Sequence, residues 1–459
     1  MKKNPDALSG ETPEITIIGG GLAGSEASWQ LAKRGYRVYL KEMRPQKQTP
    51  AHNTAFLGEL VCSNSLGADV LASPGGILKE ELRLGGSLII AAAEATKVPA
   101  GKALAVGREG FARYITQSID DHPGIIRITE EVTDIPEGPV IVATGPLTSP
   151  SLAEKIREKA GGLLAFYDAV APVITRESID FSMAYRGNRW EEKGEDYINC
   201  PMNEEEYYRF WEALQEARKA PLREFESNPA YFEGCLPVEI IASRGKDTLR
   251  FGPLRPVGLR DPRTGQEPYA VVQLRQDNLE GSLFNLVGFQ TNLLWGEQER
   301  IFRMIPGLEK AEFVRFGVMH RNSFVNAPKV LDPWLRFRGE PLLFVAGQLS
   351  GVEGYMESTA AGYAAALYLH ALLSRGEAPL WPRETALGAL LHYLQDALPE
   401  SFQPMNCNLG LFPPLEKRIK KRQERCLEVA RRALEARNAF LAGQGRVYQE
   451  DFCGNILNS

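Results

Sequence analysis

The chain has 459 residues, 44% hydrophobic and 24% charged, which is long enough for two or three domains of a globular protein. Its formal net charge of −5 excludes a global positive field, so any nucleic-acid contact must use a local patch. Its six cysteines are irregularly spaced, which indicates reduced thiols, and no apolar run is long enough to span a bilayer. We therefore expect a cytoplasmic protein with no membrane contact and no metal.

The first folded segment carries a dinucleotide-binding fingerprint. A β-branched strand at residues 15–18 enters Gly19-Gly20-Gly21-Leu22-Ala23-Gly24, and a predicted helix and a second strand then lead to Glu42. Gly19 allows a tight turn, Gly21 lets the backbone approach a pyrophosphate, and Gly24 lets the helix pack closely. Glu42 stands where a carboxylate accepts hydrogen bonds from ribose hydroxyls. The alternative is an ordinary tight turn between a strand and a helix. It is the weaker interpretation, because the strand, the glycines, the helix and the acid follow one another at the spacing of a dinucleotide site.

Two later strands that end in glycine favour FAD as the dinucleotide. Residues 139–142 are followed by Ala143-Thr144-Gly145, which resembles the second sheet signature of FAD-dependent enzymes. Residues 342–346 are followed by Gly347, Gln348 and Gly351, and then by a helix of small residues that can lie close to the sheet. The alternative is that both strands are ordinary α/β core. Their positions on either side of a long middle segment favour a discontinuous FAD-binding domain.

The middle segment differs in composition, because it is rich in aromatic, charged and turn residues, with strands predicted at 269–274 and 283–289. We predict an α/β fold with a Rossmann-like FAD-binding domain at residues 14–175 and 325–440, and a smaller α+β insertion domain at 176–324. The part from residue 384 onward is predicted to be helical. It holds one basic run, and a run of this kind is most often only the solvent-exposed face of a helix. We keep its cations as candidate nucleic-acid contacts: Lys417, Arg418, Lys420 and Lys421.

Cys62 and Cys235 each lie in a distinctive segment, Val61-Cys62-Ser63-Asn64-Ser65 and Glu233-Gly234-Cys235-Leu236-Pro237. Neither has the neighbours of a zinc ligand. A thiol among small polar residues near a predicted helix start can be held as a thiolate by backbone N–H groups. The alternative for any cysteine is a buried inert thiol, which we keep for the other four: Cys200, Cys407, Cys426 and Cys453.

Longer motifs make the chain similar to the folate- and FAD-dependent tRNA uracil-5-methyltransferase family over about residues 14–430. Besides the glycine-rich turn and the Cys62 segment, they include Glu42-Met43-Arg44-Pro45, Thr49-Pro50-Ala51-His52, Leu259-Arg260-Asp261-Pro262-Arg263-Thr264-Gly265, Gly317-Val318-Met319-His320-Arg321-Asn322 and Gly351-Val352-Glu353-Gly354-Tyr355. The resemblance implies that 5,10-methylenetetrahydrofolate supplies a one-carbon unit, through FAD reduced by NAD(P)H, to C5 of the T-loop uridine of tRNA. It also implies that the T-arm elbow of tRNA docks on the protein.

The family's two functional cysteines correspond to Cys62 and Cys235. Uracil C5 is a poor nucleophile until a thiolate adds to C6, and we assign this covalent role to Cys235. Cys62 is assigned to the one-carbon unit at the flavin and to the C5 proton. His320 stands just before the second part of the predicted FAD-binding domain, which places it near the flavin. Its ring there can stack on a pterin, and Tyr355 can do so from the other flank, although a structural role is equally open for each.

Other interpretations remain open from the sequence. One is a flavin-dependent oxidoreductase of a small metabolite, in which the two cysteines form a redox pair. Another is a related flavin- and folate-dependent protein that modifies a tRNA wobble uridine, although such proteins usually have longer C-terminal helical regions. A third is an RNA-binding protein that keeps flavin for structure.

Overall fold

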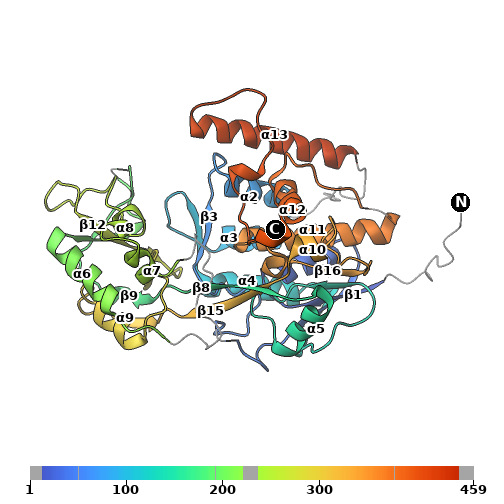
Figure 1. Cartoon of the computed structure of the whole chain (residues 1–459), viewed down its shortest axis with the longest axis horizontal. Coiled ribbons are helices and arrows are strands. Elements are labelled where there is room, and N and C mark those ends of the chain that lie inside the picture. The colour runs from blue at the N-terminus through green and yellow to red at the C-terminus, as the bar shows by residue number, and fades with distance from the viewer. Residues whose placement is uncertain (1–12, 50, 192, 221–235, 377, 444–459) are drawn as a thin grey trace, which may run out of the picture.

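The computed structural model describes residues 13–49, 51–191, 193–220, 236–376 and 378–443, which form a larger and a smaller unit side by side (Figure 1). The larger unit is built on a five-stranded parallel sheet. Its strands, in spatial order, are β16 (Leu343–Val345), β7 (Val140–Val142), β1 (Glu14–Ile18), β2 (Arg37–Glu42) and β6 (Ile125–Thr129). The aliphatic side chains of the four strands β16, β7, β1 and β2 are almost fully buried, which is typical of a parallel sheet covered on both faces. The predicted α/β class and Rossmann-like sheet are confirmed.

Two helices from opposite ends of the chain cross tightly at this sheet. Helix α1 (Leu22–Ala32) follows β1, and α11 (Tyr355–Arg375) follows β16. A Cβ atom at Gly362 of α11 would lie 2.2 Å from the carbonyl oxygen of Ala23, so only glycine permits this crossing. The predicted helix of small residues therefore packs as expected. Further helices of this unit are α2 (Pro74–Leu84), α3 (Leu88–Ala95), α4 (Arg108–Asp120), α5 (Pro150–Ala160), α10 (Ala327–Val330) and α12 (Ala386–Asp396).

A small antiparallel sheet lies beside these helices. It orders β3 (Ser65–Ala68), β5 (Ala103–Val106) and β4 (Lys97–Val98), and β3 begins three residues after Cys62. The Cys62 segment therefore precedes a strand, and our expectation of a nearby helix start is wrong. The run Ser63-Asn64-Ser65 forms local turns through its own side chains, with the Ser65 N–H donating to Ser63 Oγ at 3.1 Å.

The smaller unit is a six-stranded antiparallel sheet with its own hydrophobic core. Its strands, in spatial order, are β10 (Tyr185–Arg186), β11 (Tyr197–Met202), β12 (Ala270–Gln276), β13 (Leu283–Leu286), β9 (Val173–Thr175) and β14 (Phe313–Arg315). Its helices are α6 (Glu204–Glu216), α7 (Val238–Ser243), α8 (Thr248–Phe251) and α9 (Trp295–Phe302). The predicted strands at 269–274 and 283–289 correspond to β12 and β13, which pair with each other. An antiparallel pair, β8 (Leu164–Ala169) and β15 (Met319–Phe324), joins the two units.

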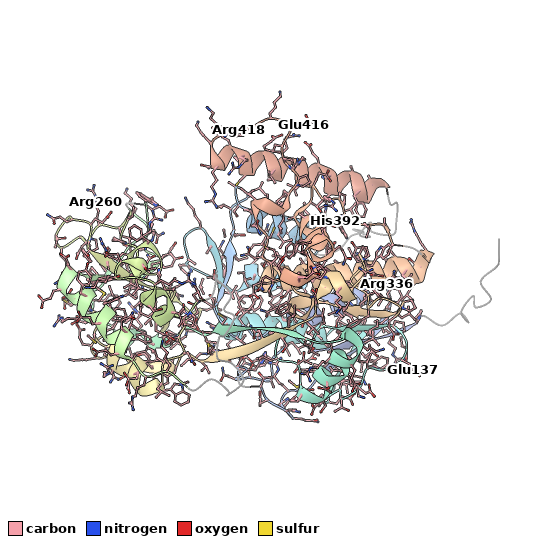
Figure 2. All side chains as sticks on the ribbon, in the orientation of Figure 1. Glu137, Arg260, Arg336, His392, Glu416 and Arg418 are labelled. Carbon is pink, nitrogen blue, oxygen red and sulfur yellow. The ribbon has the colours of Figure 1, made fainter. Side chains whose placement is uncertain are left out.

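The C-terminal helix α13 (Arg422–Gly443) lies along the outer edge of the larger unit (Figure 1). We expected the basic run at 417–422 to be helical, but the structure places residues 417–421 in the connection before α13. Four cations in a first helical turn would oppose the helix dipole, whereas α13 as formed has Glu424 there. Lys417, Arg418, Lys420 and Lys421 are all exposed, and Arg418 lies beside α13 at the surface (Figure 2). Among the described residues, no helix is long and apolar enough to cross a membrane.

Candidate functional site

The glycine-rich turn joins β1 to α1 at the carboxyl end of the parallel sheet. Gly19 has a φ of 101°, and a Cβ there would lie 2.7 Å from the carbonyl oxygen of Ala143. A Cβ at Gly24 would lie 1.8 Å from the carbonyl oxygen of Gly19, so this residue lets the helix follow the turn at once. At Gly21 a Cβ would meet nothing within 4 Å. That open space lies at the start of α1, whose N-terminus has no side-chain cap, and it leaves room for an anion on the helix N-terminus.

Glu42 at the end of β2 holds this turn in place. One carboxylate oxygen accepts the Gly20 N–H at 2.8 Å, and the other accepts the backbone N–H and the Nε of Arg44, both at 3.0 Å. Burial raises the pKa of Glu42, but the hydrogen bonds and charge of Arg44 outweigh it and leave the pKa below its ordinary value. Arg44 also pairs with Glu59 at 3.2 Å. Sequence reasoning did not predict Arg44 and Glu59 as site residues, although Arg44 stands two residues after Glu42 in the motif Glu42-Met43-Arg44-Pro45.

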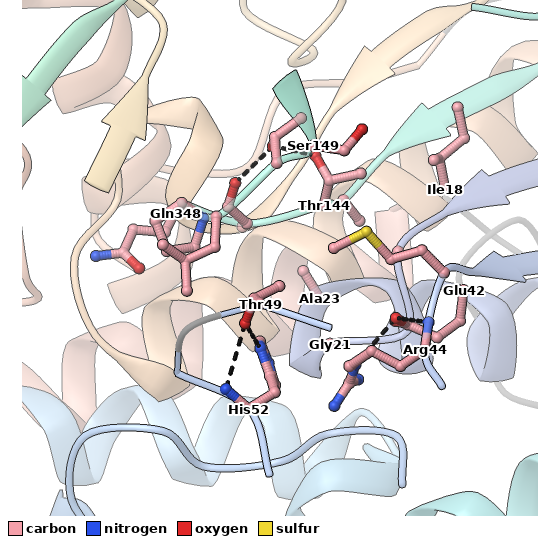
Figure 3. Close-up of a pocket in the computed structure, with 18 of the residues that line it drawn as sticks. Ile18, Gly21, Ala23, Glu42, Arg44, Thr49, His52, Thr144, Ser149 and Gln348 are labelled. Atoms are coloured by element: carbon pink, nitrogen blue, oxygen red, sulfur yellow. Dashed lines mark hydrogen bonds and ion pairs between the residues drawn. The ribbon is translucent and has the colours of Figure 1, made fainter. Parts of the chain in front are cut away.

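Glu42, Arg44 and Glu59 line one cavity at the carboxyl end of the parallel sheet, where ligands of open α/β folds bind. Its wall is built from both ends of the chain (Figure 3). The predicted cofactor residues that line it are Gly19, Gly21, Leu22, Ala23, Glu42, Gly145, Gly347 and Gln348. Gly20, Gly24 and Gly351 do not line it, and a Cβ at Gly351 would instead lie 2.5 Å from the ring of Phe402.

Among the polar residues of the cavity that were not predicted as site residues are Thr49, His52, Thr144 and Ser149. Thr49 and His52 lie on one side, where Thr49 Oγ1 is 2.6 Å from His52 Nδ1. Thr144 and Ser149 lie on the opposite side of the cavity (Figure 3). They belong to loops that follow strands of the sheet, where ligands of open α/β folds bind. Their sequence signals were the motif Thr49-Pro50-Ala51-His52 and the run Ala143-Thr144-Gly145.

Cys62 lies at the edge of this cavity and is half-buried. The phenol oxygen of Tyr355, the first residue of α11, accepts the N–H groups of Cys62 at 2.8 Å and Ser63 at 3.1 Å. Tyr355 and Val61 both line the cavity, so the thiol segment is tied to its wall. The Cys62 thiol donates to the carbonyl oxygen of Ala169 at 3.4 Å. Burial raises the pKa of Tyr355 above its ordinary value.

Three arginines bind the segment around Cys62, two through its backbone and one through the side chains of its neighbours. Arg108 donates to the carbonyl oxygens of Leu60 at 2.7 Å and Cys62 at 3.3 Å, and Arg315 donates to that of Val61 at 2.6 Å. Arg275 donates to Ser63 Oγ at 2.7 Å and Asn64 Oδ1 at 2.8 Å. Arg275 and Arg315 come from the smaller unit, whereas Arg108 comes from α4 of the larger one. No sequence motif brings these distant residues together.

Asp277 is the carboxylate bound to this cluster, and its two oxygens lie 2.9 Å from the Nε of Arg108. Burial and the nearby Arg108 cation lower the pKa of Arg315, which has no ion pair with any carboxylate in the described part of the chain. The surroundings of Cys62 therefore carry excess positive charge, which favours an anionic ligand.

The remaining predicted residues are placed as follows. Cys235 lies outside the described residues. His320 lies on β15 opposite Asp168, and its side chain is not described. The three other described cysteines are buried, and burial raises the pKa of Cys200 and of Cys407, so neither of these two has the character of a reactive thiol. Within the described ranges, no group of three or more histidines, cysteines or carboxylates could hold a metal.

A parallel sheet with a glycine-rich turn and a cavity at its carboxyl end defines the class of dinucleotide-binding α/β proteins. The family model "Glucose inhibited division protein A" matches residues 14–377. The chain is 59% identical to "Methylenetetrahydrofolate--tRNA-(uracil-5-)-methyltransferase TrmFO" of Moorella thermoacetica, over 93% of this chain and 98% of the relative. It is 56% identical to the protein of the same name from Geobacter sulfurreducens, over 94% and 99%.

Among solved structures, Aquifex aeolicus GidA matches with a TM-score of 0.67 and 18% identity, covering 94% of this chain and 74% of that one, which shows a common fold. The chain belongs to the Glucose inhibited division protein A family and to the family of methylenetetrahydrofolate–tRNA-(uracil-5-)-methyltransferases. The family predicted from the sequence motifs is thus confirmed.

Proposed function

We propose that the protein transfers the one-carbon unit of 5,10-methylenetetrahydrofolate to C5 of the T-loop uridine of tRNA, with FAD as bound cofactor and NAD(P)H as reductant. The product is 5-methyluridine. Relatives that are 54–59% identical over nearly the whole chain bear the name of this activity. The observation that carries the proposal is Cys62, whose segment is tied through Tyr355 to the wall of the dinucleotide cavity.

The cavity fits FAD. The open space at Gly21 and the uncapped N-terminus of α1 suit a pyrophosphate, and the Glu42 carboxylate beside the turn suits the ribose. Gly145 and Gly347, with φ of 68° and 72°, bring two further loops to the cavity wall. Bound FAD supplies the redox chemistry that completes the methyl group. We assign the flavin ring to the side near Tyr355, because Cys62 lies there.

The chain's own residues supply the chemistry on uracil. The Cys235 sulfur forms a bond to uracil C6, which moves electron density onto C5 and makes C5 nucleophilic. After the one-carbon unit is attached, loss of the C5 proton allows the C6–sulfur bond to break and frees Cys235. Cys62 is the base we assign to that proton, and Tyr355, Arg108 and Arg315 are positioning residues that hold its backbone. His320 and Tyr355 are our candidates for stacking on the pterin.

The tRNA contacts that we propose outside the catalytic cavity are Lys417, Arg418, Lys420 and Lys421, which are exposed in a single connecting segment. Such cations bind phosphates without reading sequence, and so suit the docking of a tRNA elbow. A reducing cytoplasm is the expected location, because the four described cysteines are free thiols.

The test is an assay of methyl transfer from labelled methylenetetrahydrofolate to unmodified tRNA, with NADPH present. We expect labelled 5-methyluridine in the T loop, no product when folate is omitted, and full activity in Cys426→Ala, which removes a buried thiol of α13 as a matched control. Label in the wobble nucleoside would support the related tRNA-modifying activity instead. NADPH oxidation that depends on a small metabolite, with no labelled RNA, would support an oxidoreductase.

A further inference from the structure

A stack of aromatic rings runs from the core of the smaller unit to its surface. Phe313 contacts Phe302 in the core with ring centroids 6.5 Å apart, and Phe316 stacks on Phe313 at 5.3 Å and 16°. Trp295, the first residue of α9, stacks in turn on Phe316 at 5.4 Å and 13°. Trp295 is nevertheless 62% exposed, so its ring adds a broad flat surface to the end of a nearly parallel stack. This is the geometry on which a further planar ring can stack.

The stack is fixed by hydrogen bonds on both sides. The buried Gln298 side chain donates to the carbonyl oxygens of Leu293 at 2.7 Å and Gly317 at 2.9 Å, and accepts the Gly317 N–H at 2.7 Å. These partners flank Trp295 and Phe316 in the chain, so one side chain sets the distance between the two rings. A Cβ at Gly317 would lie 2.5 Å from Thr291, which leaves no room for this loop to shift. A ring held in this way loses little conformational entropy when a ligand binds.

Described residues that flank the two candidate cysteines in the sequence lie near the stack. Ala220 and Val238 lie on either side of Cys235 in the sequence, and both bond the loop just before Trp295. The Ala220 N–H donates to the Asn292 carbonyl at 2.8 Å, and the Val238 N–H donates to the Gln290 carbonyl at 2.7 Å. On the other side, Arg315 precedes Phe316 and bonds the carbonyl of Val61, next to Cys62. The described chain on both sides of the stack therefore leads toward the two cysteines to which we assign the chemistry on uracil.

Charge at the stack suits the backbone of RNA. Arg315 lies beside the Arg108 cation without a carboxylate partner in the described structure, and Arg218, which is paired with Glu297 of α9, is largely exposed. A phosphate near Arg315 would relieve its repulsion with Arg108. Proteins that recognise single-stranded RNA loops combine such cations with aromatic rings on which unstacked bases lie.

We propose that the outer face of Trp295 is a stacking site for a nucleobase of the substrate's single-stranded loop, next to the target uridine. The proposal rests on the proposed function and adds to it a residue that selects an opened loop over a stacked helix. Trp295 is a positioning residue here, because it holds the RNA and takes no part in bond formation.

The test compares Trp295→Ala, Trp295→Phe and the matched control Trp190→Ala, which removes another highly exposed tryptophan. The dissociation constant for unmodified tRNA is measured over a range of salt concentrations. One stacked base corresponds to about a tenfold weaker affinity or more in Trp295→Ala. Trp295→Phe should recover most of the affinity, and Trp190→Ala should bind like the parent. The dependence on salt should not change, because no phosphate contact is removed. FAD content and Tm report whether each variant folds.

Parental affinity in Trp295→Ala, with FAD retained, overturns the proposal, and so does an equal loss in Trp190→Ala. The proposal is also overturned if the parent is a dimer and Trp295→Ala is a monomer. That result would mean that the stack is an interface between two copies of the chain. If the parent binds tRNA with the expected dependence on Trp295 but forms no 5-methyluridine, the proposed function fails and the stacking site stands.

Discussion

The sharpest test of the cofactor cavity is Gly21→Val. Gly21 has ordinary extended backbone angles, φ −74° and ψ −168°, and a Cβ there meets no atom within 4 Å. The valine should therefore leave the fold intact while its methyl groups occupy the space on the N-terminus of α1. Each hydrogen bond to a charged group that is lost costs about 1.5–3 kcal/mol, so loss of one bond to the pyrophosphate should weaken FAD binding about ten- to a hundredfold. The measurement is titration of apoprotein with FAD, followed by flavin fluorescence.

Two matched variants separate loss of cofactor from loss of fold. Gly24→Val places a Cβ 1.8 Å from the Gly19 carbonyl oxygen, so it should lower the Tm of the apoprotein, which Gly21→Val should not. Gly443→Val, at the end of α13 and with open space around its Cβ, should change neither property. A Gly21→Val protein that binds FAD with parental affinity would refute the assignment of this turn to the pyrophosphate.

Four further outcomes are expected. Cys235→Ala should abolish methyl transfer and the covalent complex with 5-fluorouracil-containing T-loop RNA, while FAD content and reduction by NAD(P)H persist; near-parental methylation would contradict the mechanism. Cys62→Ala should stop turnover and alter the flavin spectrum, yet still capture the 5-fluorouracil RNA through Cys235. Replacing Lys417, Arg418, Lys420 and Lys421 by glutamine should weaken tRNA binding and reduce its salt dependence, without changing FAD content; unchanged affinity would move the docking surface elsewhere. Burial lowers the pKa of Lys79 from 10.5 to about 8. Between pH 8 and 10.5 the folded protein therefore binds fewer protons than the unfolded chain, so the free energy of unfolding should rise with pH in this window. The rise should be smaller in Lys79→Met, which has no ammonium group at this position.

The parallel sheet and its turn were predictable because they are local. Strand, glycines and helix follow one another within about 20 residues, and the spacing of the glycines in the sequence indicates the structural role of each one. The same holds for the strands that end at Gly145 and Gly347. The domain boundaries at residues 176 and 325 stay predictions.

The setting of Cys62 was not predictable, because it depends on residues that meet only in the folded chain. Arg108, Arg275 and Arg315 are separated by up to about two hundred residues in sequence, and none belongs to a motif with a known spacing. The expectation of a helix start near Cys62 failed because small polar residues favour turns as readily as helix caps. Trp295 gave no sequence signal either, since an exposed aromatic residue is distinguished only by the ring stacked beneath it.

The arginine clamp gives the two-unit architecture a chemical consequence. Cys62 belongs to the larger unit, yet two of the three guanidinium groups that hold its segment come from β12 and β14 of the smaller one. A change in the packing of the units would therefore shift the thiol relative to the cavity wall that Tyr355 forms. Arg275→Ala should show this, because it removes hydrogen bonds to Ser63 and Asn64 without touching the cavity. We expect FAD affinity to stay parental while methyl transfer falls at least about tenfold, since a misplacement of about 1 Å is enough to cost that much. Parental turnover in this variant would mean that Tyr355 and Arg108 suffice to place the thiol, and that the smaller unit serves RNA binding alone.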